Sequence, residues 1–288
     1  MRIGIGPYYF KRYGDGGAER MRRHGFDFMD FDCYADINGE LYRGDDAEFI
    51  GNTEALAEKL RTAGYSVWQI HGPWIYPAPN ATEAERNIWF EKCVRAIRAA
   101  SILGAEFMAI HPLMPFGVGR HTQKEVDALY SINLDFFRRL APVAEKQGVT
   151  LCLENMPFPD FPISSTVEIM KIVTAVDSPN FCVCLDTGHA NVVGPDPAES
   201  VRLIGKDYLK ILHVHGNDGK QDCHYNPMAD GDTVDWNAFS TALREIGFDG
   251  IFSLETSVNS TSLTDGEREE REIRLANIAK QIANGHTL

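Results

Sequence analysis

The most constraining feature of this sequence is the regular alternation of short apolar runs with longer segments of helical periodicity along its 288 residues. The apolar runs are nearly continuous, which is typical of strands that are buried on both faces of a parallel sheet. Glycine often stands where a helical segment gives way to the next run, as expected at a helix C-terminus. The runs cover residues 3–6, 26–31, 66–71, 106–111, 150–154, 181–186, 209–215 and 250–255.

Eight strand–helix units are the number that closes into a barrel, whereas an open doubly wound sheet usually has fewer strands. No linker rich in Pro, Gly or Ser divides the chain. We therefore predict one α/β domain over residues 1–288, folded as a (β/α)8 TIM barrel. The clearest helical segments are 47–63, 83–102, 124–147 and 235–246, and Gly64, Gly104, Gly148 and Gly247 stand at their ends.

Six consecutive strand-like runs, from the third to the eighth, each end in a side chain that can bind a metal ion. The C-terminal strand ends of a TIM barrel surround one mouth, where active sites are built, so residues far apart in sequence meet there. Strand ends also accept Asn, Ser, Thr and Gly, so finding only His, Asp and Glu favours a functional site. We predict a metal site at the C-terminal face of the barrel. The six residues are His71, His111, Glu154, Asp186, His215 and Glu255.

Three further candidate ligands follow the sixth and seventh runs. His189 comes three residues after Asp186 in the sequence D-T-G-H. Asp222 and His224 form a D-x-H pair within the irregular stretch 216–234. A loop of this length in a compact domain is usually functional, although a solvated polar loop is the alternative interpretation of this pair.

Two histidines of the seventh run share one face of the strand, because strand side chains alternate. They are His213 and His215. We expect only His215, which lies nearer the mouth, to reach the metal site. His213 is then an interior residue of the barrel or a hydrogen-bond donor to a ligand.

Short motifs around these residues resemble the xylose-isomerase-like TIM-barrel superfamily. This superfamily includes sugar-phosphate isomerases and epimerases, ketose 3-epimerases, inosose dehydratases and endonuclease IV-type DNA-repair enzymes. The resemblance covers nearly the whole chain in element order, but its motifs do not select the reaction. The motifs are LENMP around Glu154, CLDTGHAN around Asp186, HVHGNDG around His215, DCH at 222–224, VDW at 234–236 and SLET around Glu255.

The resemblance implies a divalent metal ion held by Glu154, Asp186, His215 and Glu255. In the epimerase branch the two glutamates also act as the acid/base pair, and the residue that matches His189 contacts the substrate. The endonuclease IV branch implies three zinc ions instead. Its pattern assigns His71, His111 and Glu154 to the first zinc, Glu154, Asp186, His215 and Glu255 to the second, and His189, Asp222 and His224 to the third.

Two Glu, one Asp and one His form an oxygen and nitrogen ligand set without a thiolate. Such a set suits Mn²⁺, Zn²⁺, Co²⁺ or Mg²⁺, and the predicted content is one to three ions. The metal would polarise a carbonyl and stabilise the enediolate formed when a neighbouring C–H loses its proton. If Glu154 and Glu255 stand on two sides of the substrate, one removes a proton and the other returns a proton to the opposite face, which gives epimerisation. If a single base serves both carbons, the same site gives aldose–ketose isomerisation.

The leading hypothesis is therefore a divalent-metal-dependent isomerase or epimerase of a small sugar or sugar-like polyol. The complete set of nine zinc-ligand positions keeps an endonuclease acting on abasic DNA as an alternative. A formal net charge of −13 disfavours that alternative, because phosphate contacts supply most of the affinity for nucleic acids. An inosose-type dehydratase, or a sugar- or metal-binding protein without catalysis, would use the same site.

Three weaker candidates concern substrate binding. Trp74 is a candidate wall of the pocket and Lys220 a candidate contact to a substrate hydroxyl, with ordinary packing and solvation as the alternatives. The stretch 11–23 follows the first strand and carries five basic and two acidic residues. It is a candidate site for a substrate phosphate or carboxylate, and a solvated helix face is the alternative.

The six cysteines form no C-x-x-C pair, and most of them lie in or beside apolar strand-like runs. We expect reduced, buried thiols and a cytoplasmic location. No apolar run has the length of a membrane span, and the first residues do not resemble a signal peptide. We expect a small-molecule carbohydrate partner, no nucleic acid, no membrane and a possible homo-oligomer.

Overall fold

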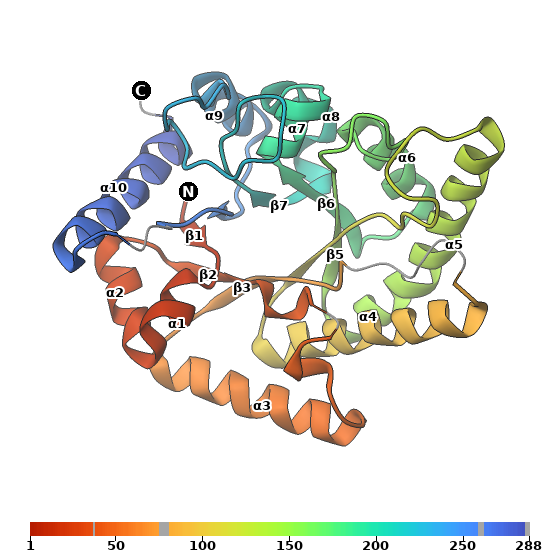
Figure 1. Ribbon diagram of the computed structural model, residues 1–288, viewed down its shortest axis with the longest axis horizontal. Helices are drawn as coiled ribbons and strands as arrows, with labels where there is room; N and C mark the ends of the chain where they lie inside the picture. Colours follow the sequence, from red (N-terminus) through yellow and green to blue (C-terminus); the bar gives the residue numbers. More distant parts are fainter. Residues whose placement is uncertain (37, 75–80, 259–261, 286–288) are drawn as a thin grey trace.

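The computed structural model describes residues 1–36, 38–74, 81–258 and 262–285. Its sheet has eight parallel strands that neighbour one another in chain order, and β1 also pairs with β8. A bridge between Val214 and Leu254 joins the end of β7 to β8 and closes the ring. The predicted (β/α)8 barrel is confirmed (Figure 1). The strands are β1 Ile3–Ile5, β2 Phe28–Phe31, β3 Val67–His71, β4 Phe107–Ile110, β5 Thr150–Glu154, β6 Phe181–Asp186, β7 Leu209–His213 and β8 Phe252–Leu254.

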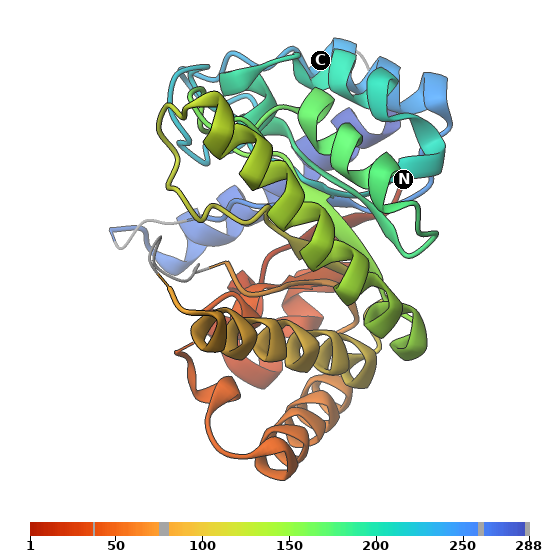
Figure 2. The same cartoon turned by 90° about the vertical axis from the view of Figure 1, so that its right-hand side faces the viewer.

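Helices form an outer layer around this ring, and Figure 2 shows α3 to α6 following one another along one flank. Helix α10 returns beside β1, so that the amino group of Met1 donates a hydrogen bond to Asn284 at 2.9 Å. The helices are α1 Tyr8–Tyr13, α2 Gly17–His24, α3 Asp46–Ala63, α4 Glu83–Leu103, α5 Gln123–Gln147, α6 Thr166–Val176, α7 Thr187–Val193, α8 Pro197–Tyr208, α9 Trp236–Ile246 and α10 Asp265–Asn284.

Local sequence signals explain where the longest helices begin and end. Helices α3, α4, α5 and α10 each start at a capping box, in which an Asp or Thr side chain and a Glu three residues later satisfy each other's backbone N–H groups. The predicted glycine stops are confirmed, because Gly64, Gly104, Gly148 and Gly247 all adopt left-handed backbone conformations with φ of 87°, 76°, 68° and 67°.

Several predicted runs are longer than the strands they contain. Phe26 is buried but precedes the paired part of β2, because apolar residues at the bottom of the barrel pack without joining the sheet. At the mouth, the β6–β7 ladder ends at the pair Asp186 and His213. His215 and Glu255 therefore lie just beyond the last strand residues, where the chain turns into the loops that form the mouth.

Small and sulfur-containing side chains fill one layer of the barrel interior. The cluster contains Ala109, Cys152, Cys182, Cys184 and Ile211, which come from four neighbouring strands. Among the cysteines whose side chains the structure describes, all are free and four are buried, as expected from the sequence. In the described part of the chain, no helix is both long and apolar enough to span a bilayer.

Candidate metal and catalytic site

The strand ends bring the predicted ligands together at one mouth of the barrel. His71 at the end of β3 and His111 just after β4 direct their Nε2 atoms at each other, 3.1 Å apart. The same atoms lie 3.5 Å and 3.2 Å from Oε2 of Glu154, at the end of β5. All three side chains are buried. They form one corner of the site.

The centre of the site is a group of carboxylates with one imidazole. Ligand atoms of Glu154, Asp186, His213 and Glu255 all lie within 4.8 Å of one another. His213 Nδ1 is 3.0 Å from Glu154 Oε1 and 3.3 Å from Glu255 Oε2. His213 therefore reaches the site as well as His215, and it does so in the role the sequence allowed for it, an interior residue hydrogen-bonded to the candidate ligand Glu154. His213 is the last residue of β7, paired with Asp186 of β6, and from there it contacts the two glutamates.

Asp30, at the end of β2, is a site residue that the sequence reasoning missed. Its Oδ2 atom is 3.3 Å from His213 Nε2 and accepts a hydrogen bond from Gln69 at 2.6 Å. Burial opposes protonation of His213, but the surrounding acidic groups raise the pKa of the imidazole well above its usual value. Both ring nitrogens then donate to carboxylates. The available signal was an acidic residue inside the otherwise apolar strand Phe28–Phe31.

A second group forms where the loop after β7 folds back over the mouth. It contains His189, His215, Asp222 and His224, again with ligand atoms within 4.8 Å of one another. His215 Nε2 is 3.1 Å from Oδ1 of Asp186, which connects this group to the central carboxylates. Asp222 lies 3.4 Å from His189 and 3.1 Å from His224. The D-x-H pair thus lies beside the other candidate ligands, although its side chains keep 33% and 39% of their surface exposed to solvent.

Three residues of the D-T-G-H sequence at 186–189 have a packing role at the start of α7. The Asp186 carboxylate caps this helix by accepting a hydrogen bond from the backbone N–H of His189 at 2.7 Å. The Thr187 hydroxyl bonds the backbone of His215. A side-chain carbon at Gly188 would collide with the His215 ring, so only glycine fits between α7 and the imidazole.

The unsatisfied polar atoms of the site fit a bound cation. Among the described residues, Glu154 Oε2, Asp186 Oδ2, His215 Nε2 and Glu255 Oε2 are buried and make no hydrogen bond of good geometry, although three of them lie 3.1–3.3 Å from a histidine nitrogen or carboxylate oxygen of the site. Such atoms are rare in folded proteins, because each one costs desolvation free energy. The other nitrogen of His215 faces the Gly216 carbonyl at 3.1 Å, which leaves the Nε2 lone pair available. His215 therefore suits a metal-ligand role better than His213, whose two ring nitrogens both face carboxylates.

The two glutamates experience different electrostatic surroundings. Desolvation raises the pKa of Glu255 to about 7, and the charges of Glu154 and Asp186 act in the same direction. Burial would also raise the pKa of Glu154, but the imidazoles of His213 and His111 outweigh it and hold that pKa well below its usual range. Of the two glutamates, Glu255 therefore binds a proton more readily than Glu154.

The two weaker candidates lie at different distances from this centre. Trp74 is 49% exposed, and its ring centroid is 6.4 Å from that of His111, so it lies at the rim of the mouth. Lys220 is exposed on the loop after β7, and no described contact joins its side chain to the site. The substrate roles of Trp74 and Lys220 stay predictions.

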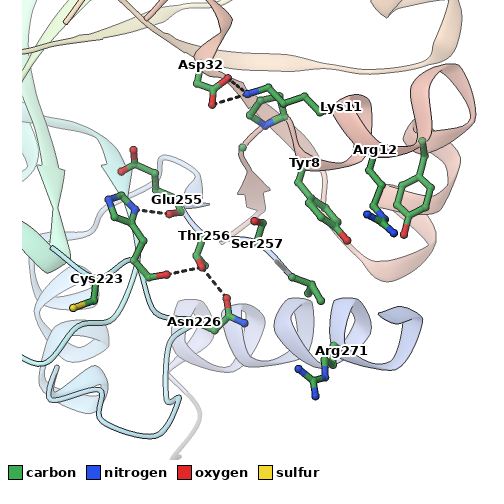
Figure 3. A pocket seen from close by; sticks show the side chains of 15 residues that line it. Tyr8, Lys11, Arg12, Asp32, Cys223, Asn226, Glu255, Thr256, Ser257 and Arg271 are labelled. Atoms are coloured by element: carbon green, nitrogen blue, oxygen red, sulfur yellow. Dashed lines mark hydrogen bonds and ion pairs between the residues drawn. The ribbon is translucent and has the colours of Figure 1, made fainter. Parts of the chain in front are cut away.

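A large cavity opens directly beside Glu255, and we call it the α1 cavity (Figure 3). Its volume is about 1260 Å³. One side is formed by the loop after β7 and the residues that follow β8, and the other sides by α1 and α10. Its lining includes Tyr8, Arg12, His224, Glu255, Thr256 and Arg271.

A closed parallel barrel with acidic and imidazole side chains gathered at the C-terminal strand ends defines a class of TIM-barrel protein. Residues 18–278 match the model of the family described as Xylose isomerase-like TIM barrel. The chain belongs to this family, and the resemblance seen in its motifs is confirmed.

The relatives of this chain are named as proteins of several classes. The uncharacterised protein MJ1311 of Methanocaldococcus jannaschii is 31% identical over 192 residues, which cover 65% of this chain and 63% of that protein. A probable endonuclease 4 of Mesomycoplasma hyopneumoniae is 29% identical over 213 residues, or 69% of this chain and 70% of that protein. D-psicose 3-epimerase of Ruminiclostridium cellulolyticum is 28% identical over 151 residues, or 52% and 48%.

Solved structures share the fold over the whole chain. A D-psicose 3-epimerase crystallised in the presence of D-fructose superposes with a TM-score of 0.77 at 17% identity, covering 99% of this chain and 100% of that chain. The IOLI protein with a binding zinc atom has a TM-score of 0.69 at 18% identity, covering 100% and 99%.

Proposed function

We propose that this protein is a divalent-metal-dependent isomerase or epimerase of a small sugar or sugar-like polyol. The observation that carries the proposal is the pair Glu154 and Glu255, which share one buried site with unsatisfied ligand atoms beside an open cavity. The sugar epimerase among the relatives supports the same class of reaction. The free thiols of the described cysteines favour a reducing compartment such as the cytoplasm.

The residues that would hold the cation are Glu154, Asp186, His215 and Glu255, with Mn²⁺, Zn²⁺, Co²⁺ and Mg²⁺ all compatible with these donors. A bound cation supplies a Lewis acid that polarises the substrate carbonyl and stabilises the enediolate.

The protein's own side chains handle the proton. One glutamate takes the proton from the carbon beside the carbonyl, and the other returns a proton to the opposite face, which inverts that carbon. Glu154 and Glu255 are suited to this exchange because they come from β5 and from the end of β8, on different sides of the mouth. His213 contacts both carboxylates and restrains their positions.

Solvent exchange tests the assignment of the bases. In D₂O, the protein loaded with Mn²⁺ is expected to exchange the C3 hydrogen of D-fructose, and Glu154→Gln and Glu255→Gln are each expected to abolish the exchange. Glu40→Gln, an exposed glutamate outside the site, is the control. Metal content is measured in parallel. Unimpaired exchange in a metal-loaded Glu154→Gln protein would refute the base role of Glu154.

A second candidate is a trinuclear zinc phosphodiesterase acting on abasic DNA. One observation favours it: the nine predicted ligands form connected groups that include both His71 with His111 and the loop residues Asp222 with His224. A relative named probable endonuclease 4 supports it. Elemental analysis is decisive, because this candidate requires about three zinc ions per chain together with cleavage of an abasic duplex. Loss of water from a sugar, seen by NMR, would instead identify a dehydratase.

A further inference from the structure

We propose that Thr256 is a positioning residue for Glu255, the residue that it directly follows. Its hydroxyl fastens the end of β8 to the loop after β7 and so fixes the Glu255 main chain relative to His224. We call the hydrogen bonds among Glu255, Thr256, His224 and Asn226 the mouth clasp. The inference rests on the proposed function and adds the residue that sets the position of one of its two acid/base groups.

The sheet holds Glu255 on one side only. The last ladder pair of β8 joins Leu254 to Ile5, and Glu255 lies one residue further along the chain. Its backbone N–H donates a hydrogen bond to the Val214 carbonyl at 2.9 Å, on the side of β7. The direction in which the Glu255 side chain leaves the barrel therefore depends on what holds the peptide group that follows it.

That peptide group is held by the loop after β7. Nδ1 of the His224 imidazole lies 2.9 Å from the Glu255 carbonyl oxygen. The Thr256 hydroxyl lies 3.0 Å from the His224 carbonyl oxygen and 2.8 Å from Oδ1 of Asn226 (Figure 3). A hydroxyl carries one hydrogen, so these two acceptors share it. The end of β8 and the loop thus hold each other through contacts in both directions.

The backbone of His224 has a conformation that needs support from its surroundings. Its φ is 46°, in the left-handed region that residues other than glycine seldom adopt. The next residue, Tyr225, exchanges two backbone hydrogen bonds with Gly216 at 2.8 Å and 2.9 Å, and the mouth clasp holds His224 itself. Such conformations persist where surrounding contacts enforce them, and they concentrate at functional sites. The strained backbone supports a role for the clasp in placing the His224 ring.

The ring that the clasp places lies against the other candidate ligands. Because the Glu255 carbonyl can only accept, Nδ1 of His224 carries the hydrogen, and Nε2 lies 3.1 Å from Oδ1 of Asp222. The rings of His224 and His215 stack, with centroids 3.9 Å apart and an angle of 10° between their planes. A shift of the Glu255 main chain would therefore displace the carboxylate and the stacked imidazoles together.

Such a shift matters because a general base must lie within hydrogen-bond reach of the proton that it takes. Small misplacements of a reacting group lower the rate of a reaction steeply. Thr256 is only half-buried and lines the α1 cavity, so replacing its hydroxyl by a methyl group leaves the core of the barrel intact. Loss of this hydroxyl is expected to affect the position of Glu255 and not the folding of the chain.

The hydrogen on Nδ1 of His224 tests the clasp without catalysis. In the Zn²⁺-loaded protein, NMR of the histidine ring nitrogens is expected to detect this hydrogen, and the signal is assigned by its absence from His224→Gln. Thr256→Val removes the hydroxyl and keeps the shape of the side chain. The hydrogen should then exchange with water about two- to tenfold faster, the change that corresponds to one net hydrogen bond. Thr256→Ser should resemble the wild type, and equally fast exchange in Thr256→Val and the wild type would overturn the clasp.

Proton exchange with a sugar tests the positioning of Glu255. At saturating Mn²⁺ and D-fructose in D₂O, Thr256→Val is expected to exchange the C3 hydrogen about two- to tenfold more slowly than the wild type, with little change in the half-saturating D-fructose concentration. Thr256→Ser should recover most of the rate. Asn226→Ala added to Thr256→Val should cause little further loss, because both changes remove the same contact. Thr174→Val is the control, since Thr174 is exposed on α6 and its hydroxyl bonds within that helix.

The outcomes separate this inference from the proposed function. If the wild type exchanges the hydrogen and Thr256→Val exchanges it equally fast, the positioning role is refuted. A loss in Thr256→Val that Thr256→Ser does not recover would also refute it, because the hydroxyl would then not be the group responsible. A wild type that exchanges no hydrogen, while the Nδ1 hydrogen of His224 still depends on Thr256, would refute the proposed function and retain the clasp.

Discussion

Individual side chains at the barrel mouth owe their positions to neighbours that need not touch a substrate. His213 is the clearest case, because it donates to Glu154 on one side and faces Asp30 on the other. Hydrogen bonds of this kind orient ligands and tune their basicity, so residues behind the ligands influence metal affinity strongly. The position of Glu154 therefore depends on β2 and β7 as well as on its own strand.

Replacing His213 by glutamine is expected to weaken metal binding. The change removes the imidazole between Asp30 and Glu154, and losses of about 10–100-fold in affinity are typical for such supporting residues. Competition with a chromophoric chelator measures the effect. His121→Gln is the control, because His121 packs against Phe116 and Phe161 away from the site. Equal metal affinities of the wild type and His213→Gln would contradict the role given to His213.

Gly188→Ala is expected to damage the site by displacing His215. Its new methyl group collides with the imidazole ring, and overpacking of this kind costs about 1–3 kcal/mol of stability. Gly266→Ala is the matched control, since nothing lies within 4 Å of a side-chain carbon there. The control should be neutral or slightly stabilising, because alanine favours a helix over glycine. Thermal unfolding and metal content give the two readouts, and wild-type values for both in Gly188→Ala would refute the steric argument.

Among the larger elements, the loop after β7 contributes most to the site while having the least regular structure. It carries Asp222 and His224, and Asp232 fixes it from within. The Asp232 carboxylate accepts hydrogen bonds from the backbone of Asn217 and Met228 and from the Trp236 indole, at 3.2 Å, 2.8 Å and 2.6 Å. One side chain thus joins both ends of the loop to α9.

Asp232→Ala is expected to loosen this loop selectively. Loss of these contacts, and of a fourth from the backbone N–H of Val234 at 3.1 Å, should make residues 216–234 more susceptible to limited proteolysis, because cleavage follows the population of locally open states. It should also weaken metal binding at Asp222 and His224 more than at Glu154. Asp230→Ala, an exposed position in the same loop, provides the comparison. Similar cleavage rates in the two variants would rule out the fastening role of Asp232.

The elements themselves were largely predictable, because periodicity and end signals are local. The strands 150–154 and 181–186 match the structure at both ends, and the glycine stops agree. The other runs exceed their strands by one or two residues at one end or both, most clearly at 26–31, 209–215 and 250–255. Apolar character reports burial, and at the mouth the buried residues include loop residues that pair with no neighbouring strand.

Across the molecule, closure of the barrel made most site residues predictable and left their pairing unpredictable. A ring of strands brings every C-terminal end to one mouth, so Glu154 and Glu255 meet although they are far apart in sequence. Which imidazole faces which carboxylate depends on barrel width and side-chain conformation, which the sequence pattern does not encode. For that reason Asp30 was missed, the carboxylates that His213 contacts could not be named, and the α1 cavity could not be foreseen.

Removing the metal is expected to destabilise the entire barrel, because four strands end in the same cluster of buried acidic and imidazole groups. A ligand that binds only the folded state stabilises it by about 4 kcal/mol at a thousand times its dissociation constant. At about 2–4 °C per kcal/mol for chains of this size class, chelation should lower the midpoint of thermal unfolding by roughly 8–16 °C.

Glu154→Gln should start with a lower midpoint than the metal-loaded wild type and show little further decrease on chelation, because its central ligand is already impaired. Glu40→Gln, whose carboxyl is exposed, should behave like the wild type. A midpoint that does not respond to chelation in the metal-loaded wild type would mean that the buried cluster is satisfied without a cation, and the metal-dependent function proposed for it would fail.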